Sequence, residues 1–347
     1  VFFFLTPLFL EPKDGKKYAP ERAFAGDLKE TKKHFSRLGL SAFVILGLGT
    51  AVQILAMGVA NNVWPQWLEN SWGMWLLTFA PLYLIAVPVG LLLLRKVPVK
   101  PLEKHDLKPV RYLVSAIICI FMMYAGNILG TIITALLQLL PGISAGNPIL
   151  SYATDNALLP KILFMVILAP VIEEYIFRKQ LIDRMHVYGE KLAVITSALM
   201  FGLFHGNLSQ LFYAFALGLV FGYVYLKTGK LRYSISLHML INFIGSVAGP
   251  FFLEKIAVLG TMETLDMVAL ESIMPWLIGF GAYVLVLIGL AITGLVLLCI
   301  NKRKVSFAPA ELELPKDDRF MTVYGNVGMI LLVVGCTALI VASLIPL

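Results

Sequence analysis

The stretch that decides the fold lies at residues 161–184, which read Lys-Ile-Leu-Phe-Met-Val-Ile-Leu-Ala-Pro-Val-Ile-Glu-Glu-Tyr-Ile-Phe-Arg-Lys-Gln-Leu-Ile-Asp-Arg. Its first dozen residues are almost purely apolar and form most of a membrane-spanning helix. Two adjacent carboxylates, Glu173 and Glu174, then appear within it, and Arg178 follows closely. Each charge at bilayer depth costs about 2.5–3.5 kcal/mol to insert, so these groups must face protein or water.

Helical spacing divides the three charged groups. Glu174 and Arg178 are four residues apart with the acid first, which stacks them on one face in the favourable order. Glu173 points about 100° away, so we expect Glu174 to pair with Arg178 while Glu173 stays free to act. Pro170 removes a backbone hydrogen bond and predicts a kink. The alternative is an ion pair that only locks two helices together, but ionisable groups inside membranes favour a functional site.

The composition indicates a polytopic membrane protein. Of 347 residues, 59% are hydrophobic and 14% are charged, and the mean hydropathy is +0.84. These values exclude an ordinary soluble globular protein. The net charge is +7, but the basic residues lie in short loops, which indicates membrane topology and predicts no nucleic-acid partner.

Hydropathy predicts nine spans. They cover about residues 38–60, 73–94, 112–140, the Glu-Glu segment, 191–206, 208–227, 233–252, 274–300 and 321–345. Alternate loops are basic and the others are poor in Lys and Arg, which predicts a cytosolic N-terminus and an outer C-terminus. We also expect a bacterial plasma membrane location. Because backbone groups in lipid must bond internally, the expected fold is all-α, a polytopic transmembrane helical bundle.

The expected organisation is one transmembrane domain with a short lead-in. Residues 1–37 are dense in charge and predict a cytosolic amphipathic lead-in, whereas residues 38–347 form the domain, with a catalytic core at 160–252 in spans four to seven. Two glycine pairs on the sixth and seventh spans predict close helix packing in this core. The pairs are Gly218 with Gly222 and Gly245 with Gly249.

Three further polar residues lie in apolar spans. His205 ends the fifth span, and His238 lies in the seventh span with Asn242 four residues later on the same face. A lone intramembrane histidine is often an interhelical hydrogen-bonding group. Two histidines, an amide and two carboxylates on three spans instead predict a shared cavity, in the cytosolic half of the bilayer or near its middle.

These groups suit hydrolysis of an amide bond. A buried glutamate can take a proton from water, and a histidine can hold that water in line. A second histidine and an amide N–H can stabilise the oxyanion that forms. The sequence contains no His-Glu-x-x-His, so a zincin helix is not indicated.

Three motifs in this order resemble the CPBP family, the CAAX-protease and bacteriocin-processing (Abi) intramembrane proteases. They are Glu173-Glu174-x-x-x-Arg178, Phe201-x-x-x-His205 and His238-x-x-x-Asn242. The similar core covers about residues 160–250. The resemblance implies a glutamate-dependent intramembrane endopeptidase that acts on a membrane-associated peptide or protein. Glu173 would then be the general base and His205 would hold the water. His238 and Asn242 would form the oxyanion site, and Glu174 and Arg178 would support the geometry.

Several alternatives remain open at the level of sequence. Glu173, His205 and His238 could ligate zinc, but no short-range ligand pair enforces a metal, and we favour a metal-independent mechanism. A non-catalytic scaffold or bacteriocin-immunity protein would carry the same residues. An ion-coupled transporter would use the same groups as a proton path, but it would usually show paired broken helices in two repeated halves, and the sequence shows none.

Overall fold

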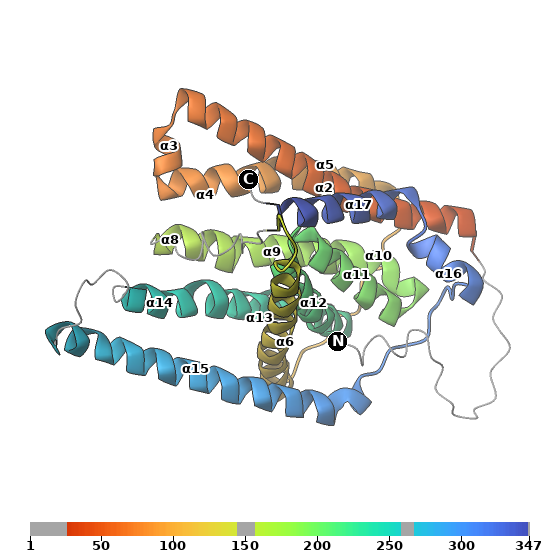
Figure 1. Ribbon diagram of the computed structural model, residues 1–347. Helices are drawn as coiled ribbons and strands as arrows, with labels where there is room; N and C mark the ends of the chain where they lie inside the picture. Colours follow the sequence, from red (N-terminus) through yellow and green to blue (C-terminus); the bar gives the residue numbers. More distant parts are fainter. Residues whose placement is uncertain (1–25, 144–156, 258–266, 346–347) are drawn as a thin grey trace.

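The computed structural model describes residues 26–143, 157–257 and 267–345, and within these ranges it is a bundle of helices without strands (Figure 1). The all-α fold expected from the sequence is therefore confirmed. The longer helices are α2 (Leu28–Val63), α4 (Ser71–Ala80), α6 (Pro109–Leu137), α11 (Glu190–Phe204), α12 (Leu208–Thr228), α13 (Leu231–Phe243), α15 (Met267–Asn301) and α17 (Val327–Ala342). The shorter ones are α3 (Gln66–Glu69), α5 (Val87–Leu92), α8 (Leu158–Lys161), α9 (Ala169–Glu174), α10 (Leu181–Met185), α14 (Gly249–Ala257) and α16 (Lys316–Val323).

The number of membrane crossings differs from the nine expected. Among the described residues, six helical segments are long and apolar enough to span a bilayer, or seven if the bent pair α16–α17 counts as one span. If the bent pair is counted, two of the nine predicted spans are not among these segments, namely the Glu-Glu segment and α11. The first carries several charges, and the second has 15 residues, fewer than the roughly 20 that a crossing needs. The protein is an integral membrane protein, and the count of nine is not confirmed.

The first span begins earlier than the sequence indicated. The carboxylate of Asp27 accepts a hydrogen bond from the backbone of Lys29 and caps α2, which begins at Leu28. Residues 28–37 of the expected lead-in therefore continue directly into the first span. Residues 1–25 of that lead-in lie outside the described part of the chain, as do 144–156 and 258–266 of two predicted outer loops.

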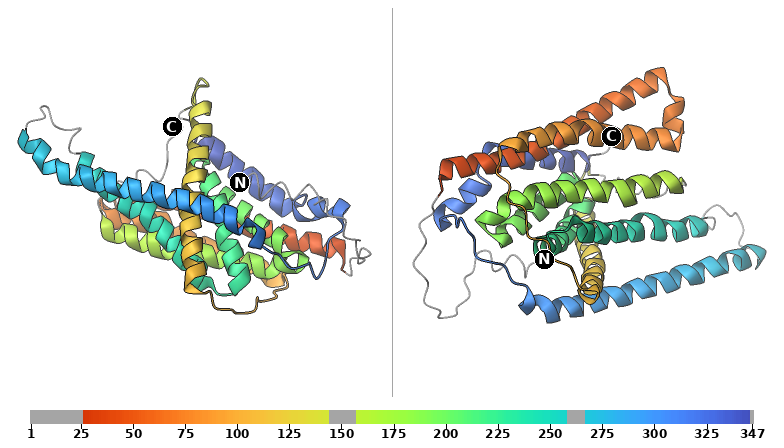
Figure 2. Two further views of the ribbon diagram at one scale, coloured as in Figure 1. Left: turned by 90° about the horizontal axis from the view of Figure 1, so that it is seen from below. Right: turned by 180° about the vertical axis from the view of Figure 1, so that it is seen from behind.

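Helices α11 and α12 form a hairpin at the centre of the bundle, and α6 packs along α12 while running across the other long helices (Figure 2). The first glycine pair makes the hairpin possible. A Cβ atom at Gly218 would lie 3.0 Å from the Cα of Ala198, and one at Gly222 would lie 3.3 Å from a methyl of Val194. The second pair does not show the same close approach, since a Cβ at Gly249 would lie 3.6 Å from the Ile244 carbonyl and 3.7 Å from the Tyr283 hydroxyl, which are ordinary contacts. A Cβ at Gly245 would meet nothing within 4 Å, because this face of the helix is open.

The loops predicted to be basic lie together at one end of the bundle, which we call the basic end. The backbone N–H of Lys100 donates to the carbonyl of Asp183 at 2.9 Å, and that of His105 donates to the carbonyl of Thr228 at 2.8 Å. The backbone N–H of Ala308 donates to the Glu190 carboxylate at 2.7 Å. These bonds join connections that are far apart in sequence. The side of the membrane that this end faces stays a prediction.

Candidate active site

The helix that carries the two glutamates is interrupted by two π-helical turns, η3 (Ile162–Leu168) before them and η4 (Tyr175–Gln180) after them. Such turns are frequent at functional sites because they change the backbone hydrogen-bond register. Glu173 and Glu174 lie in the short α-helical segment α9 between the two turns. Each turn leaves a carbonyl without its usual helical donor, and a side chain from another helix donates a hydrogen bond to this carbonyl.

The first such carbonyl is that of Met165. In an α-helix its donor would be the N–H of Ala169, but in the π-helical turn this N–H bonds to Phe164 instead. The next donor along the chain would be Pro170, which has no N–H. The side-chain amide of Asn242 donates to the Met165 carbonyl at 2.8 Å, so the proline and the asparagine together fix α13 against the glutamate helix.

The second such carbonyl is that of Phe177. The N–H of Leu181, its α-helical donor, bonds to the carbonyls of Ile176 and Arg178 instead. The hydroxyl of Ser197, on α11, donates to the Phe177 carbonyl at 2.5 Å. One serine therefore ties α11 to the same helix.

Glu174 and Arg178 form the ion pair expected from their spacing. The Nε of Arg178 lies 3.0 Å from Oε2 of Glu174 and its Nη2 lies 3.2 Å from Oε1, a two-point contact between fully buried side chains. The third nitrogen of the guanidinium donates to the Ser197 hydroxyl at 2.9 Å. The guanidinium also lies 4.9 Å from the centre of the Phe201 ring.

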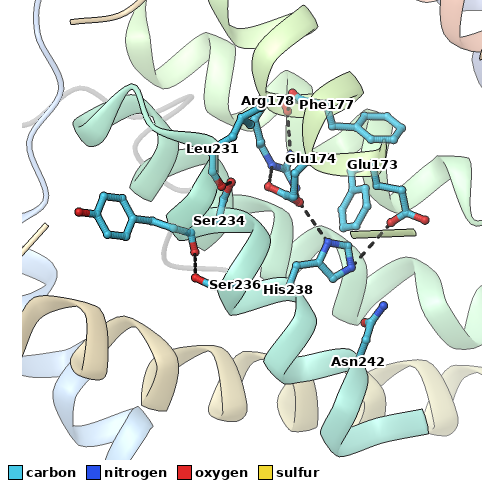
Figure 3. A network of polar contacts seen from close by, with 12 residues as sticks. Glu173, Glu174, Phe177, Arg178, Leu231, Ser234, Ser236, His238 and Asn242 are labelled. Carbon is cyan, nitrogen blue, oxygen red and sulfur yellow. Dashed lines mark hydrogen bonds and ion pairs between the residues drawn. The ribbon is translucent and has the colours of Figure 1, made fainter. Parts of the chain in front are cut away.

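His238 lies between the two glutamates (Figure 3). Its Nδ1 is 3.2 Å from Oε1 of Glu174, and its Nε2 is 3.7 Å from Oε2 of Glu173. A carboxylate only accepts, so Nδ1 carries a proton. The ring stacks on Phe221, with centroids 5.1 Å apart, and meets the edge of Phe201. Glu174 and two aromatic rings thus fix the histidine in one orientation, with Nε2 directed towards Glu173.

His205 closes α11 at the tip of the hairpin. Its Nδ1 donates to the Phe201 carbonyl at 2.8 Å, because a carbonyl can only accept. Its Nε2 is then the nitrogen without the proton in the neutral ring. The turn is fixed by Gly206, which adopts a left-handed φ of 63°, and by Asn207, whose amide donates to the His205 carbonyl at 2.9 Å.

One cavity of about 500 Å³ joins four of the six expected site residues, namely Glu173, His205, His238 and Asn242. The Glu173 side chain is 25% exposed, whereas those of Glu174 and Arg178 are fully buried behind the cavity wall. The division of the two glutamates inferred from helical spacing is thus the division that the structure has.

Sequence reasoning missed the groups that hold these side chains. Ser197 and Phe221 look like ordinary residues of apolar spans, and no signal in the sequence connects them to Arg178 or His238. Asn207 could have been found, because Gly206-Asn207 is typical of a helix end followed by a helix N-cap, and Asn207 does cap α12.

The zinc site considered from the sequence does not fit the geometry. Among the described residues, no group of three or more His, Cys, Asp or Glu side chains is arranged to hold a metal ion.

Comparison with known proteins identifies the same segment. Residues 155–244, which contain all six site residues, match the family described as Rce1-like, type II CAAX prenyl endopeptidase Rce1-like. The chain is 32% identical over 88 residues to the membrane-embedded CAAX protease MroQ of Staphylococcus aureus (strain USA300), a match that covers 23% of this chain and 36% of that protein. The matched part therefore spans about a third of this relative. No solved structure matches the chain.

Proposed function

We propose that this protein is an intramembrane endopeptidase of the CPBP type, because residues 155–244 match the Rce1-like family of CAAX endopeptidases and resemble part of a membrane-embedded CAAX protease. It would hydrolyse a peptide bond in a membrane-associated peptide or protein, using water activated by Glu173. The observation that best supports this proposal is that one cavity is lined by Glu173, His205, His238 and Asn242 together.

In the first step, the carboxylate of Glu173 takes a proton from a water molecule in the cavity while the water oxygen attacks the substrate carbonyl. The unprotonated Nε2 of His205 accepts the second hydrogen of the water and orients its lone pair. This role is supported by the bond from Nδ1 to the Phe201 carbonyl, which fixes both the ring and its tautomer.

In the same step, negative charge develops on the substrate carbonyl oxygen. The Nε2–H of a protonated His238 and the N–H of Asn242 that is not used by Met165 would donate to this oxygen. Donors that are already oriented need no reorganisation when the charge appears. The tetrahedral intermediate then collapses, the C–N bond breaks, and Glu173 returns its proton to the leaving amine.

Charge balance supports a protonated His238. The buried cluster then holds two carboxylates, Glu173 and Glu174, against a guanidinium and an imidazolium, and its net charge is zero. Unbalanced charge at this depth would be costly. Glu174 lies 3.2 Å from Nδ1 of His238 and accepts from Arg178 as well, so it would stabilise the imidazolium and remain ionised.

The experiment that tests the proposal compares membranes that contain the wild-type protein with membranes that contain Glu173→Gln. Quantitative proteomics of new peptide termini should find cleaved products only with the wild type. Glu254→Gln is the matched control, because Glu254 is exposed, is paired with its neighbour Lys255 and does not line the cavity. The same termini in the Glu173→Gln membranes would refute the proposed base.

A further inference from the structure

A second cavity, separate from the site of the two glutamates, opens near the basic end of the bundle. Its volume is about 450 Å³, and its walls come from α6, α11, α12, α15 and the chain that follows α15. The walls are largely apolar. They include Val114, Ile118, Met122, Leu219, Val220 and Leu298.

Four cations are among the residues that line this cavity. Arg111, Lys191 and Lys304 line it at the ends of α6, α11 and α15 that meet at the basic end. Within the described ranges, none of the three is paired with a carboxylate. A fourth cation, Lys227, also lines the cavity but is already paired with Glu190 at 2.7 Å. Three positive charges thus lie beside an apolar space without an acidic partner.

The apolar lining of the cavity is long enough to hold a lipid chain. Along α6 its lining runs from Arg111 through Ser115 and Ile118 to Met122, residues that share one helical face. At 1.5 Å per residue this is about 16 Å, close to the roughly 15 Å that is half of a bilayer's hydrocarbon core. Arg111 is therefore separated from the apolar far end of this lining by about the length of one lipid chain.

We propose that this cavity binds an anionic phospholipid, with the phosphate at Arg111, Lys191 and Lys304 and one acyl chain along α6 and α12. Basic pockets between membrane helices recognise such headgroups by charge, and the apolar walls bury the chain. The proposal is independent of the peptidase chemistry, since none of the lining residues belongs to the first cavity.

The test is native mass spectrometry of the full chain, released from nanodiscs that contain equal amounts of phosphatidylglycerol and phosphatidylcholine with identical acyl chains. The wild type should retain phosphatidylglycerol in preference. The variant Arg111→Gln/Lys191→Gln/Lys304→Gln should retain at least about tenfold less, since each basic residue near a lipid surface contributes to anionic lipid binding.

A control variant changes the net charge equally but leaves the cavity intact. It is Arg95→Gln/Lys96→Gln/Arg303→Gln, three exposed residues that do not line the cavity. This variant should retain the lipid as the wild type does. Ser115→Phe, which leaves every cation in place, should also reduce retention because it fills the cavity.

Four results would overturn the proposal. The first three are equal retention of the two lipids by the wild type, equal loss of lipid in the cavity and control variants, and full retention by Ser115→Phe. A fourth is displacement of phosphatidylglycerol by a prenylated peptide, because this would assign the cavity to a substrate. Circular dichroism of each variant verifies that the helices are intact.

Discussion

The buried pair of Glu174 and Arg178 gives the most quantitative prediction. Arg178→Gln removes two hydrogen bonds to Glu174 and one to Ser197, all at 2.9–3.2 Å between fully buried groups. Among the described residues, Glu174 then keeps His238 as its one side-chain donor. Leaving one partner of a buried pair uncompensated costs about 3–5 kcal/mol of unfolding free energy. Glu174→Gln should cost a similar amount, because it leaves the guanidinium uncompensated.

The double variant distinguishes a coupled pair from two independent contacts. Since Glu174→Gln/Arg178→Gln leaves neither charge unpaired, its loss should be at least about 2 kcal/mol smaller than the sum of the single losses. The assay is denaturant unfolding in mild detergent, followed by circular dichroism. Arg319→Gln is the control, since its pair with Glu313 is exposed and should contribute less than about 1 kcal/mol. Additive losses at Glu174 and Arg178 would refute the reasoning.

Three further changes test local features of the site and of the basic end. Asn242→Ala should cost about 1–3 kcal/mol in the same unfolding assay, because it leaves a carbonyl of η3 unsatisfied; unchanged stability would contradict this. Gly206→Ala should cost about 1–2 kcal/mol because φ is 63°, whereas Gly58→Ala, in an open part of α2, should not destabilise. The hydrogen bond from Lys230 lowers the pKa of Asp106, so its stabilising effect should be present at neutral pH and disappear as pH falls below about 4. The difference in melting temperature between the wild type and Asp106→Asn should therefore become smaller as the pH falls. A difference that becomes larger in acid would contradict this prediction.

The sequence predicts which site residues lie together on one helix, because residues four apart share the same helical face. The four-residue separation of Glu174 and Arg178 is enough to predict the pair, and it leaves Glu173 on the other face. Similarly, His238 and Asn242 lie one turn apart and reach the same cavity. Apolar length also predicts the helical bundle, since lipid permits few other folds.

What the sequence could not supply depends on backbone register. The π-helical turns η3 and η4 are not visible in hydropathy, so the bonds from Asn242 to Met165 and from Ser197 to Phe177 could not be anticipated. The count of nine spans is not confirmed for a related reason. An apolar run as short as α11 has the composition of a membrane helix but not the length.

The central claim is that Glu173 activates the water that cleaves the substrate. Its most direct test is the turnover number of the purified protein in liposomes, measured on a cleaved peptide identified by the proteomic comparison. The account predicts that Glu173→Gln lowers kcat by about 10²–10⁴ while peptide binding and the melting temperature stay at the wild-type values. A Glu173→Gln protein that cleaves the peptide at the wild-type rate would contradict it.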